Sequence, residues 1–264
     1  MELINKTIGQ CLREQAARNG DHPALETGRW SCTFRQLDRI SDALVKQMEA
    51  LGIIRGTHVG IWSVNSPDWV FTFLALSKIG AVPVLINTCY KEEEVKGLLN
   101  YSDVEVLYYG TRYKTIIYED IIAAIRKDTP KVRHFIHIDE DQIGKWAEET
   151  ALENSEDIGE NPGSTGEYEV LPSDAACMIF TSGTTSLPKG VELSHYNVIN
   201  NARAMIQAMK WLPEDKMCIT VPLFHCFGIT AGIVACILEG MSMHLIPYFK
   251  TAKVWDAIDR KSVV

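Results

Sequence analysis

The sequence predicts an α/β fold in which mostly parallel sheets are flanked by helices. Two observations predict it. Short apolar segments alternate with amphipathic ones between residues 58 and 139, and residues 178–195 have the pattern of a strand, a polar loop and a second strand. Strands separated by helices of this length form βαβ units with right-handed crossovers. The chain of 264 residues is long enough for one large domain or two small ones.

The N-terminal region begins with helical periodicity. The expected elements are a helix over residues 4–16, a hairpin formed by residues 24–25 and 31–34, and a helix over residues 37–51. Thr33 and Gln36 form a capping-box pattern at the start of the second helix, and Gly52 ends it.

The alternating region follows. It predicts strands at 58–64, 81–86, 104–109 and 134–139, and helices at 67–80, 88–100 and 114–126. Ser66 and Pro67 are a good N-cap and first helical residue. Glu92, Glu93 and Glu94 lie near the positive end of the helix over 88–100.

The second half of the chain opens with an acidic segment, residues 139–168, that breaks this rhythm. We expect a short helix around Trp146 and then an exposed loop, and segment 140–170 is a candidate subdomain boundary. The expected elements after residue 195 are a helix over 196–211, a strand over 217–221, an apolar helix after His225, a strand over 243–247 and a helix over 252–261. Residues 262–264 resemble the start of another strand, so we expect residues 1–264 to be an incomplete part of a longer protein.

Composition excludes several classes of function. The net charge of −8 argues against a nucleic-acid partner, because phosphate backbones attract basic surfaces. Seven scattered cysteines without a C-x-x-C pair indicate reduced thiols in a cytoplasmic protein, and His225–Cys226 lacks the second pair that a zinc site needs. No signal peptide is evident, and the longest apolar run, residues 227–238, is shorter than the roughly 20 residues that span a bilayer. We therefore expect no transmembrane segment.

The segment MIFTSGTTSLPKGVELSH, residues 178–195, carries the main chemical signal. Five hydroxyl residues and one glycine lie within residues 181–186, so the loop is rich in donors and its backbone can approach a ligand closely. Lys189 adds a point positive charge suited to phosphate. The loop is not a Walker A motif, because Pro188 replaces its second glycine and Gly190 replaces its magnesium-binding hydroxyl.

The same segment resembles the phosphate loop of the adenylate-forming enzymes, which include acyl-CoA synthetases, luciferases and peptide-synthetase adenylation domains. Their pattern is aromatic-T-S-G-T-T-G-x-P-K-G-V, and residues 180–191 match it except that Ser186 replaces the last loop glycine. The resemblance implies the fold of the N-terminal part of that family's large domain. It implies ATP-binding roles for Thr181, Ser182, Gly183, Thr184, Thr185, Ser186 and Lys189.

A second stretch, VPLFHCFG at residues 221–228, is similar to the family's P-x-[FY]-H-x-x-G motif. A histidine between aromatic residues is ordinarily a core residue, but the resemblance implies that His225 lies by the acyl carboxylate and orients it. It also implies that Phe224, His225, Phe227 and Gly228 form the acid-binding site.

The resemblance implies a two-step reaction. A carboxylate attacks the α-phosphate of ATP to give an acyl-adenylate and pyrophosphate, and coenzyme A then displaces AMP to give a thioester. Residues 33–53, 59–70 and 78–87 most resemble fatty acyl-CoA synthetases of medium- or long-chain type. The family's magnesium glutamate, ribose-binding aspartate, hinge and C-terminal lid lysine have no match here, so we expect Mg²⁺ to be bound elsewhere and this chain alone to catalyse little adenylation.

Two alternatives remain open at this point. One is an adenylation enzyme that loads an amino or aryl acid onto a carrier protein. The other is a non-catalytic nucleotide- or acyl-binding module.

Overall fold

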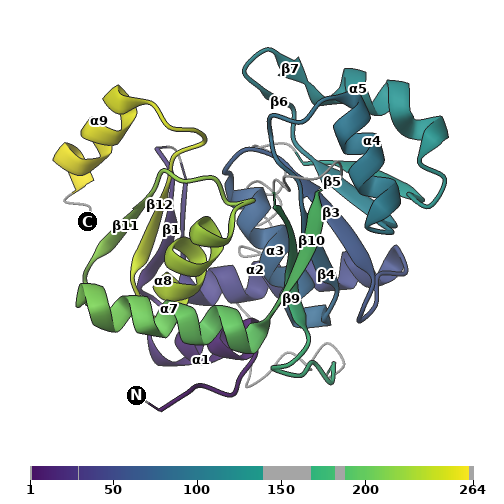
Figure 1. Ribbon diagram of the computed structural model, residues 1–264. Helices are drawn as coiled ribbons and strands as arrows, with labels where there is room; N and C mark the ends of the chain where they lie inside the picture. The colour runs from purple at the N-terminus through teal and green to yellow at the C-terminus, as the bar shows by residue number, and fades with distance from the viewer. Residues whose placement is uncertain (1, 29, 139–167, 182–187, 262–264) are drawn as a thin grey trace, which may run out of the picture.

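Two sheets organise the chain. The structure is a computed structural model that describes residues 2–28, 30–138, 168–181 and 188–261, and Figure 1 shows the sheets side by side with α2 and α3 between them. The six-stranded sheet has the order β10 (Lys189–Ser194), β9 (Ala175–Thr181), β4 (Val82–Leu85), β3 (His58–Trp62), β5 (Val106–Tyr109), β8 (His134–His137). All its pairs are parallel except that of β10 with β9.

The four-stranded sheet joins the two ends of the chain. Its order is β11 (Lys216–Ile219), β12 (Ser242–Leu245), β1 (Pro23–Glu26), β2 (Ser31–Thr33). β1 pairs with β12 in parallel, with Leu25 opposite Met243, and β2 returns antiparallel to β1. Strands on both sides of residues 139–167 therefore share each sheet.

Helices cover the faces of both sheets. They are α1 (Ile8–Arg18), α2 (Phe34–Ala50), α3 (Pro67–Ile79), α4 (Glu92–Tyr101), α5 (Tyr118–Ile125), α7 (His195–Met209), α8 (Ala235–Glu239) and α9 (Thr251–Lys261). A 3₁₀ turn, Arg126–Asp128, follows α5, and a π-helix, Gly228–Val234, leads into α8.

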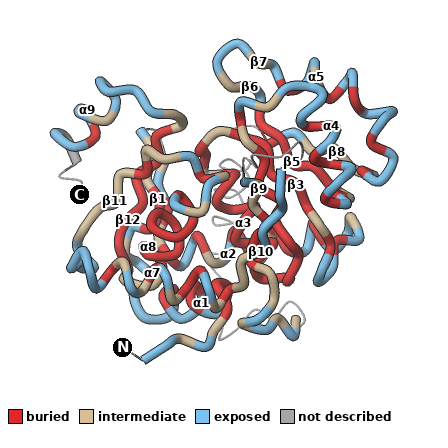
Figure 2. The backbone as a smooth tube through the Cα atoms, viewed as in Figure 1, coloured by how far each residue is buried: buried red, intermediate tan, exposed pale blue. Residues whose placement is uncertain are grey.

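Side chains along the central strands point alternately into two different hydrophobic cores. In β5, Val106 and Tyr108 belong to a core shared with α1, α2 and α3, whereas Leu107 and Tyr109 belong to a second core under α4 and α5. Successive side chains of a strand point to opposite faces, so this sheet is buried on both. Figure 2 shows the resulting buried runs through both sheets and α3.

Most predicted elements are confirmed. The hairpin of β1 and β2 forms, Thr33 and Gln36 make both capping-box hydrogen bonds of α2, and Gly80 ends α3 at φ 75°. Ser66 accepts a hydrogen bond from the backbone of Trp69, so the predicted N-cap is also confirmed. Hydrogen bonds between residues a few positions apart determine these helix and hairpin ends, so the sequence signals for them are local.

Three expectations need correction. The helix predicted over 114–126 begins only at Tyr118, because β6 (Arg112–Tyr113) and β7 (Ile116–Ile117) form a hairpin whose turn places Lys114 at φ 53°. The helix predicted over 88–100 begins at Glu92, since the Cys89 amide bonds to the Asn87 side chain instead. The apolar helix after His225 is partly a π-helix. The helix expected around Trp146 lies outside the described residues.

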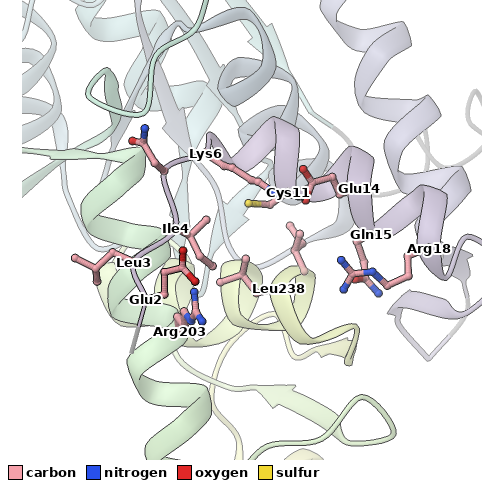
Figure 3. A pocket seen from close by; sticks show the side chains of 12 residues that line it. Glu2, Leu3, Ile4, Lys6, Cys11, Glu14, Gln15, Arg18, Arg203 and Leu238 are labelled. Atoms are coloured by element: carbon pink, nitrogen blue, oxygen red, sulfur yellow. Dashed lines mark hydrogen bonds and ion pairs between the residues drawn. The ribbon is translucent and has the colours of Figure 1, made fainter.

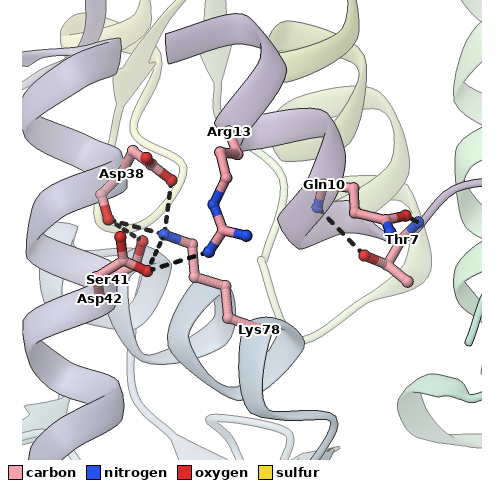
Figure 4. Close-up of polar contacts among 7 residues, drawn as sticks. All are labelled: Thr7, Gln10, Arg13, Asp38, Ser41, Asp42 and Lys78. Carbon is pink, nitrogen blue, oxygen red and sulfur yellow. Dashed lines mark hydrogen bonds and ion pairs between the residues drawn. The ribbon is translucent and has the colours of Figure 1, made fainter. Parts of the chain in front are cut away.

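A buried lysine ties three helices together. Lys78 of α3 has a side chain that is 4% exposed, and its Nζ lies 2.6 Å from Asp38 Oδ1 and 2.7 Å from Asp42 Oδ1 of α2. Arg13 of α1 also approaches Asp42 (Figure 4). Gly9 of α1 permits this packing, because a Cβ there would lie 3.0 Å from Lys78 Cγ.

We expect Lys78→Met to lower the free energy of unfolding by about 2 kcal/mol, since it removes the buried cation shared by the Asp38 and Asp42 carboxylates. Urea denaturation measures this. Lys96→Met is the control, because Lys96 makes a surface ion pair with Glu93 whose loss costs about 0.5 kcal/mol or less. Equal losses in the two variants would contradict the role of the buried ion pairs.

Candidate active site

Two paired antiparallel strands flank the predicted phosphate loop in sequence. Thr181 is the last residue of β9, Lys189 is the first of β10, and the two are paired in register. Both are exposed. Ser182, Gly183, Thr184, Thr185 and Ser186 lie outside the described residues. The two strands of the predicted strand–loop–strand pattern are confirmed, and Lys189 lies opposite Thr181 where they begin to pair.

Close packing supports the base of this hairpin. A Cβ at Gly190 would lie 3.3 Å from both Met178 Sδ and the Phe180 ring, so β10 lies tight against β9. The Phe180 ring meets Tyr101 of α4 edge-on, with centroids 6.3 Å apart. The hairpin is therefore packed against α4 as well as against the sheet.

The second candidate segment follows β11. The His225 amide donates to the Pro222 carbonyl over 3.2 Å, and the Phe227 amide donates to His225 Nδ1 over 3.3 Å. Because Nδ1 accepts, the neutral imidazole carries its proton on Nε2. No hydrogen bond to Nε2 is found among the described residues, and His225 is exposed. Its Nε2–H is thus a donor available to a ligand.

The neighbours of His225 differ in burial. Phe224 packs against the central core, whereas Phe227 is 49% exposed. Gly228 is buried, and a Cβ there would lie 2.4 Å from the Pro222 carbonyl oxygen. The turn around His225 therefore closes on itself at Gly228, where the π-helix begins. Single-turn π segments occur frequently at functional sites.

Both candidate segments follow the carboxyl end of a strand that has a parallel partner, β9 in the six-stranded sheet and β11 in the four-stranded sheet. This is the edge at which open α/β sheets bind ligands. Cys177 of β9 is buried, which raises the pKa of its thiol to about 12.

Two residues were missed by sequence reasoning. Asn65, after β3, hydrogen-bonds the segment that precedes His225. His195, at the start of α7, is fully buried, which lowers the pKa of its imidazole to about 4 against the opposing effect of Asp174. Asn65 follows a buried strand directly before the Ser66–Pro67 cap, and that position is the signal that could have found it.

One cavity lies at the base of the β9–β10 hairpin, and another lies away from the candidate residues. The first, of about 180 Å³, is lined by Phe180 and Pro188 together with residues of α4. The second, of about 490 Å³, lies between α1, α7, α8 and the N-terminal segment (Figure 3), and none of the candidate residues lines it. In the described part of the chain, no group of three or more His, Cys, Asp or Glu could hold a metal ion. Nor does any helix there have the length and apolar character to cross a membrane.

Comparison with known proteins places this geometry in a family. The family model described as AMP-binding enzyme matches residues 12–263. The chain belongs to this family. A putative acyl-CoA synthetase, YngI of Bacillus subtilis, is 31% identical to this AMP-binding chain over 98% of the chain and 50% of the relative. The human mitochondrial medium-chain acyl-CoA ligase ACSF2 is 29% identical over 98% of the chain and 46% of the relative.

Solved structures agree with the fold. The inhibitor-bound N-terminal domain of FACL13 from Mycobacterium tuberculosis has a TM-score of 0.83 and 26% identity, covering 98% of this chain and 61% of that one. The prediction of the N-terminal part of an adenylate-forming large domain is confirmed. The chain spans about half the length of the curated relatives it matches, 50% and 46% for the two named above.

Proposed function

We propose that this AMP-binding chain is the nucleotide- and acid-binding part of an ATP-dependent acyl-CoA ligase that activates a fatty carboxylate and transfers it to coenzyme A. The family match over residues 12–263 carries the proposal, and the pairing of Thr181 with Lys189 at a loop of family sequence supports it. The remaining part of the large domain and the lid domain would lie outside residues 1–264.

Each candidate residue has a chemical task in this proposal. Attack of a carboxylate on the α-phosphate needs positioning and neutralisation of phosphate charge more than covalent help. Thr181, Ser182, Gly183, Thr184, Thr185 and Ser186 supply donors to the phosphates, and Lys189 supplies positive charge. His225 orients the acid through Nε2–H, and Phe224, Phe227 and Gly228 shape its pocket.

Magnesium and coenzyme A complete the proposed reaction. The family's metal glutamate has no match in residues 1–264, so Mg²⁺ would enter with ATP and be held by residues outside this chain. When bound, it would neutralise phosphate charge.

All seven cysteines are free thiols, which supports a reducing compartment such as the cytoplasm.

Exchange of pyrophosphate with ATP tests the proposal. The panel contains fatty, aryl and amino acids, and it is run on this chain and on the protein that includes the family's remaining half. We expect exchange with fatty acids in the longer protein and little in this chain. Exchange with amino or aryl acids alone would identify a carrier-loading enzyme instead, and nucleotide binding without exchange in both would identify a non-catalytic module.

Lys189→Ala should lower kcat/KM for ATP in the longer protein by about 100-fold, the scale for losing one preorganised charge contact to a developing anion. Lys46→Ala, at an exposed position of α2, is the matched control and should leave activity unchanged. A loss of less than about threefold at Lys189 would show that the lysine does not meet the phosphates.

A further inference from the structure

Asn65 is a buried amide at the meeting point of the two sheets. It lies between the end of β3 and Ser66, the N-cap of α3, and is 4% exposed. A buried amide is costly unless its hydrogen bonds are made.

The Asn65 side chain satisfies its hydrogen bonds with backbone groups of the other sheet's strand ends. Its Nδ2 donates to the carbonyl of Val221 over 2.9 Å and to that of Ile246 over 3.1 Å. Its Oδ1 accepts from the amide of Leu223 over 2.8 Å. Both amide protons and the carbonyl oxygen are therefore used, and no other side chain of this size presents the same set.

These contacts link two sheets at their carboxyl ends. β3 belongs to the six-stranded sheet, whereas Val221 and Leu223 follow β11 and Ile246 follows β12, both in the four-stranded sheet. The Asn65 backbone amide adds a bond to the Pro247 carbonyl over 3.3 Å.

The clamped segment leads directly to His225. Val221 and Leu223 flank Pro222, whose carbonyl accepts from the His225 amide over 3.2 Å. The same carbonyl stands against Gly228. A shift of the Val221–Leu223 backbone would therefore move His225 and the start of the π-helix together.

We infer that Asn65 is a positioning residue that clamps residues 221–228 and so holds His225 in place for the acid substrate. The inference rests on the proposed function of His225. Asn65 itself is not assigned any contact with substrate.

The isosteric change Asn65→Asp tests this in the longer ligase. It replaces two donors by an oxygen that faces two carbonyl oxygens, with almost no change in volume. We expect kcat/KM for the acid to fall by about 100-fold, as a displacement of about 1 Å does. The KM for ATP should stay within about twofold, because Thr181 and Lys189 lie on the β9–β10 hairpin.

Asn200→Asp is the matched control. The Asn200 side chain also makes three backbone hydrogen bonds, accepting from the Ile4 amide over 2.8 Å and donating to the carbonyls of Ile4 and Tyr196 over 2.9 Å each. It binds the N-terminal segment to α7, and none of these three bonds involves residues 221–228. We expect Asn200→Asp to lower the free energy of unfolding without changing kcat/KM for the acid more than it changes the KM for ATP. If Asn65→Asp changes kcat/KM for the acid and the KM for ATP by equal factors, Asn65 has only a structural role and the inference is overturned.

Amide hydrogen exchange on this chain provides a test that does not depend on activity. In Asn65→Ala, which is milder to the fold, the Leu223 amide loses its acceptor and should exchange at least about tenfold faster than in the unaltered chain. Unchanged protection of Leu223 would overturn the clamp. Faster exchange, combined with absence of ligase activity in the unaltered longer protein, would preserve the clamp and reject the proposed function instead.

Discussion

Replacing Gly228 with alanine is expected to lower kcat/KM for the acid by more than about 100-fold in the proposed ligase, the protein that includes the family's remaining half. The new Cβ would lie 2.4 Å from the Pro222 carbonyl oxygen and 2.9 Å from Leu223 Cα. Both are backbone atoms, which cannot move aside as the end of a flexible side chain can. The segment must shift, and His225 moves with it.

The same substitution should lower the free energy of unfolding by about 3 kcal/mol, at the upper end for overpacking a buried site. Gly97→Ala in α4 is the control. Nothing lies within 4 Å of a Cβ at Gly97, so alanine there should stabilise the helix by about 0.5–1 kcal/mol. Kinetics and urea denaturation of both variants measure the difference. A Gly228→Ala variant with ordinary activity and stability would mean that the turn before the π-helix yields easily.

Stability should fall by about 3 kcal/mol as pH drops from about 6.5 to 4 because of His195 alone. Burial lowers the pKa of this imidazole from 6.5 to about 4. In that interval the unfolded chain binds a proton that the folded chain does not, so protons favour unfolding. Below about pH 4 both states are protonated and this contribution stops changing.

His195→Asn tests this pH dependence. The imidazole Nδ1 accepts a hydrogen bond from the Ile8 amide over 3.3 Å, and the asparagine oxygen can take that place without titrating. The variant should be less stable at pH 7.5, because it leaves a cavity, but its unfolding free energy should fall less between pH 6.5 and 4.5. Parallel pH profiles of the two proteins would show that another group causes the acid sensitivity.

Elements with local signals could be predicted from sequence. The capping residues Thr33 and Ser66, the glycine at residue 80 and the alternating segments gave helices and strands close to their observed bounds. The β9–β10 hairpin was also predictable, since an apolar strand and an alternating one flank a polar run. In each case, neighbouring residues determine the structure.

Features that depend on distant contacts could not be predicted. Nothing in the sequence near Leu25 indicates that β1, besides its hairpin partner β2, also pairs with β12. The β6–β7 hairpin replaced the first turn of a predicted helix because Lys114 adopts a left-handed conformation, which lysine rarely does. Asn65 and His195 are notable only for partners more than 150 residues away in sequence. Their environment exists only in the folded chain.

The pairing of β1 with β12 also sets an order of events during synthesis on the ribosome. Met243 is made 218 residues after Leu25, the difference of their numbers. At about 5–20 residues per second, this takes about 10–40 s. During that time the ribosome also makes β3, β4, β5 and β8, which can associate with one another. The edge of β1 that later pairs with β12 stays unpaired meanwhile. The hairpin of β1 and β2 is thus made before β3, β4, β5 and β8 but acquires its last strand partner after them.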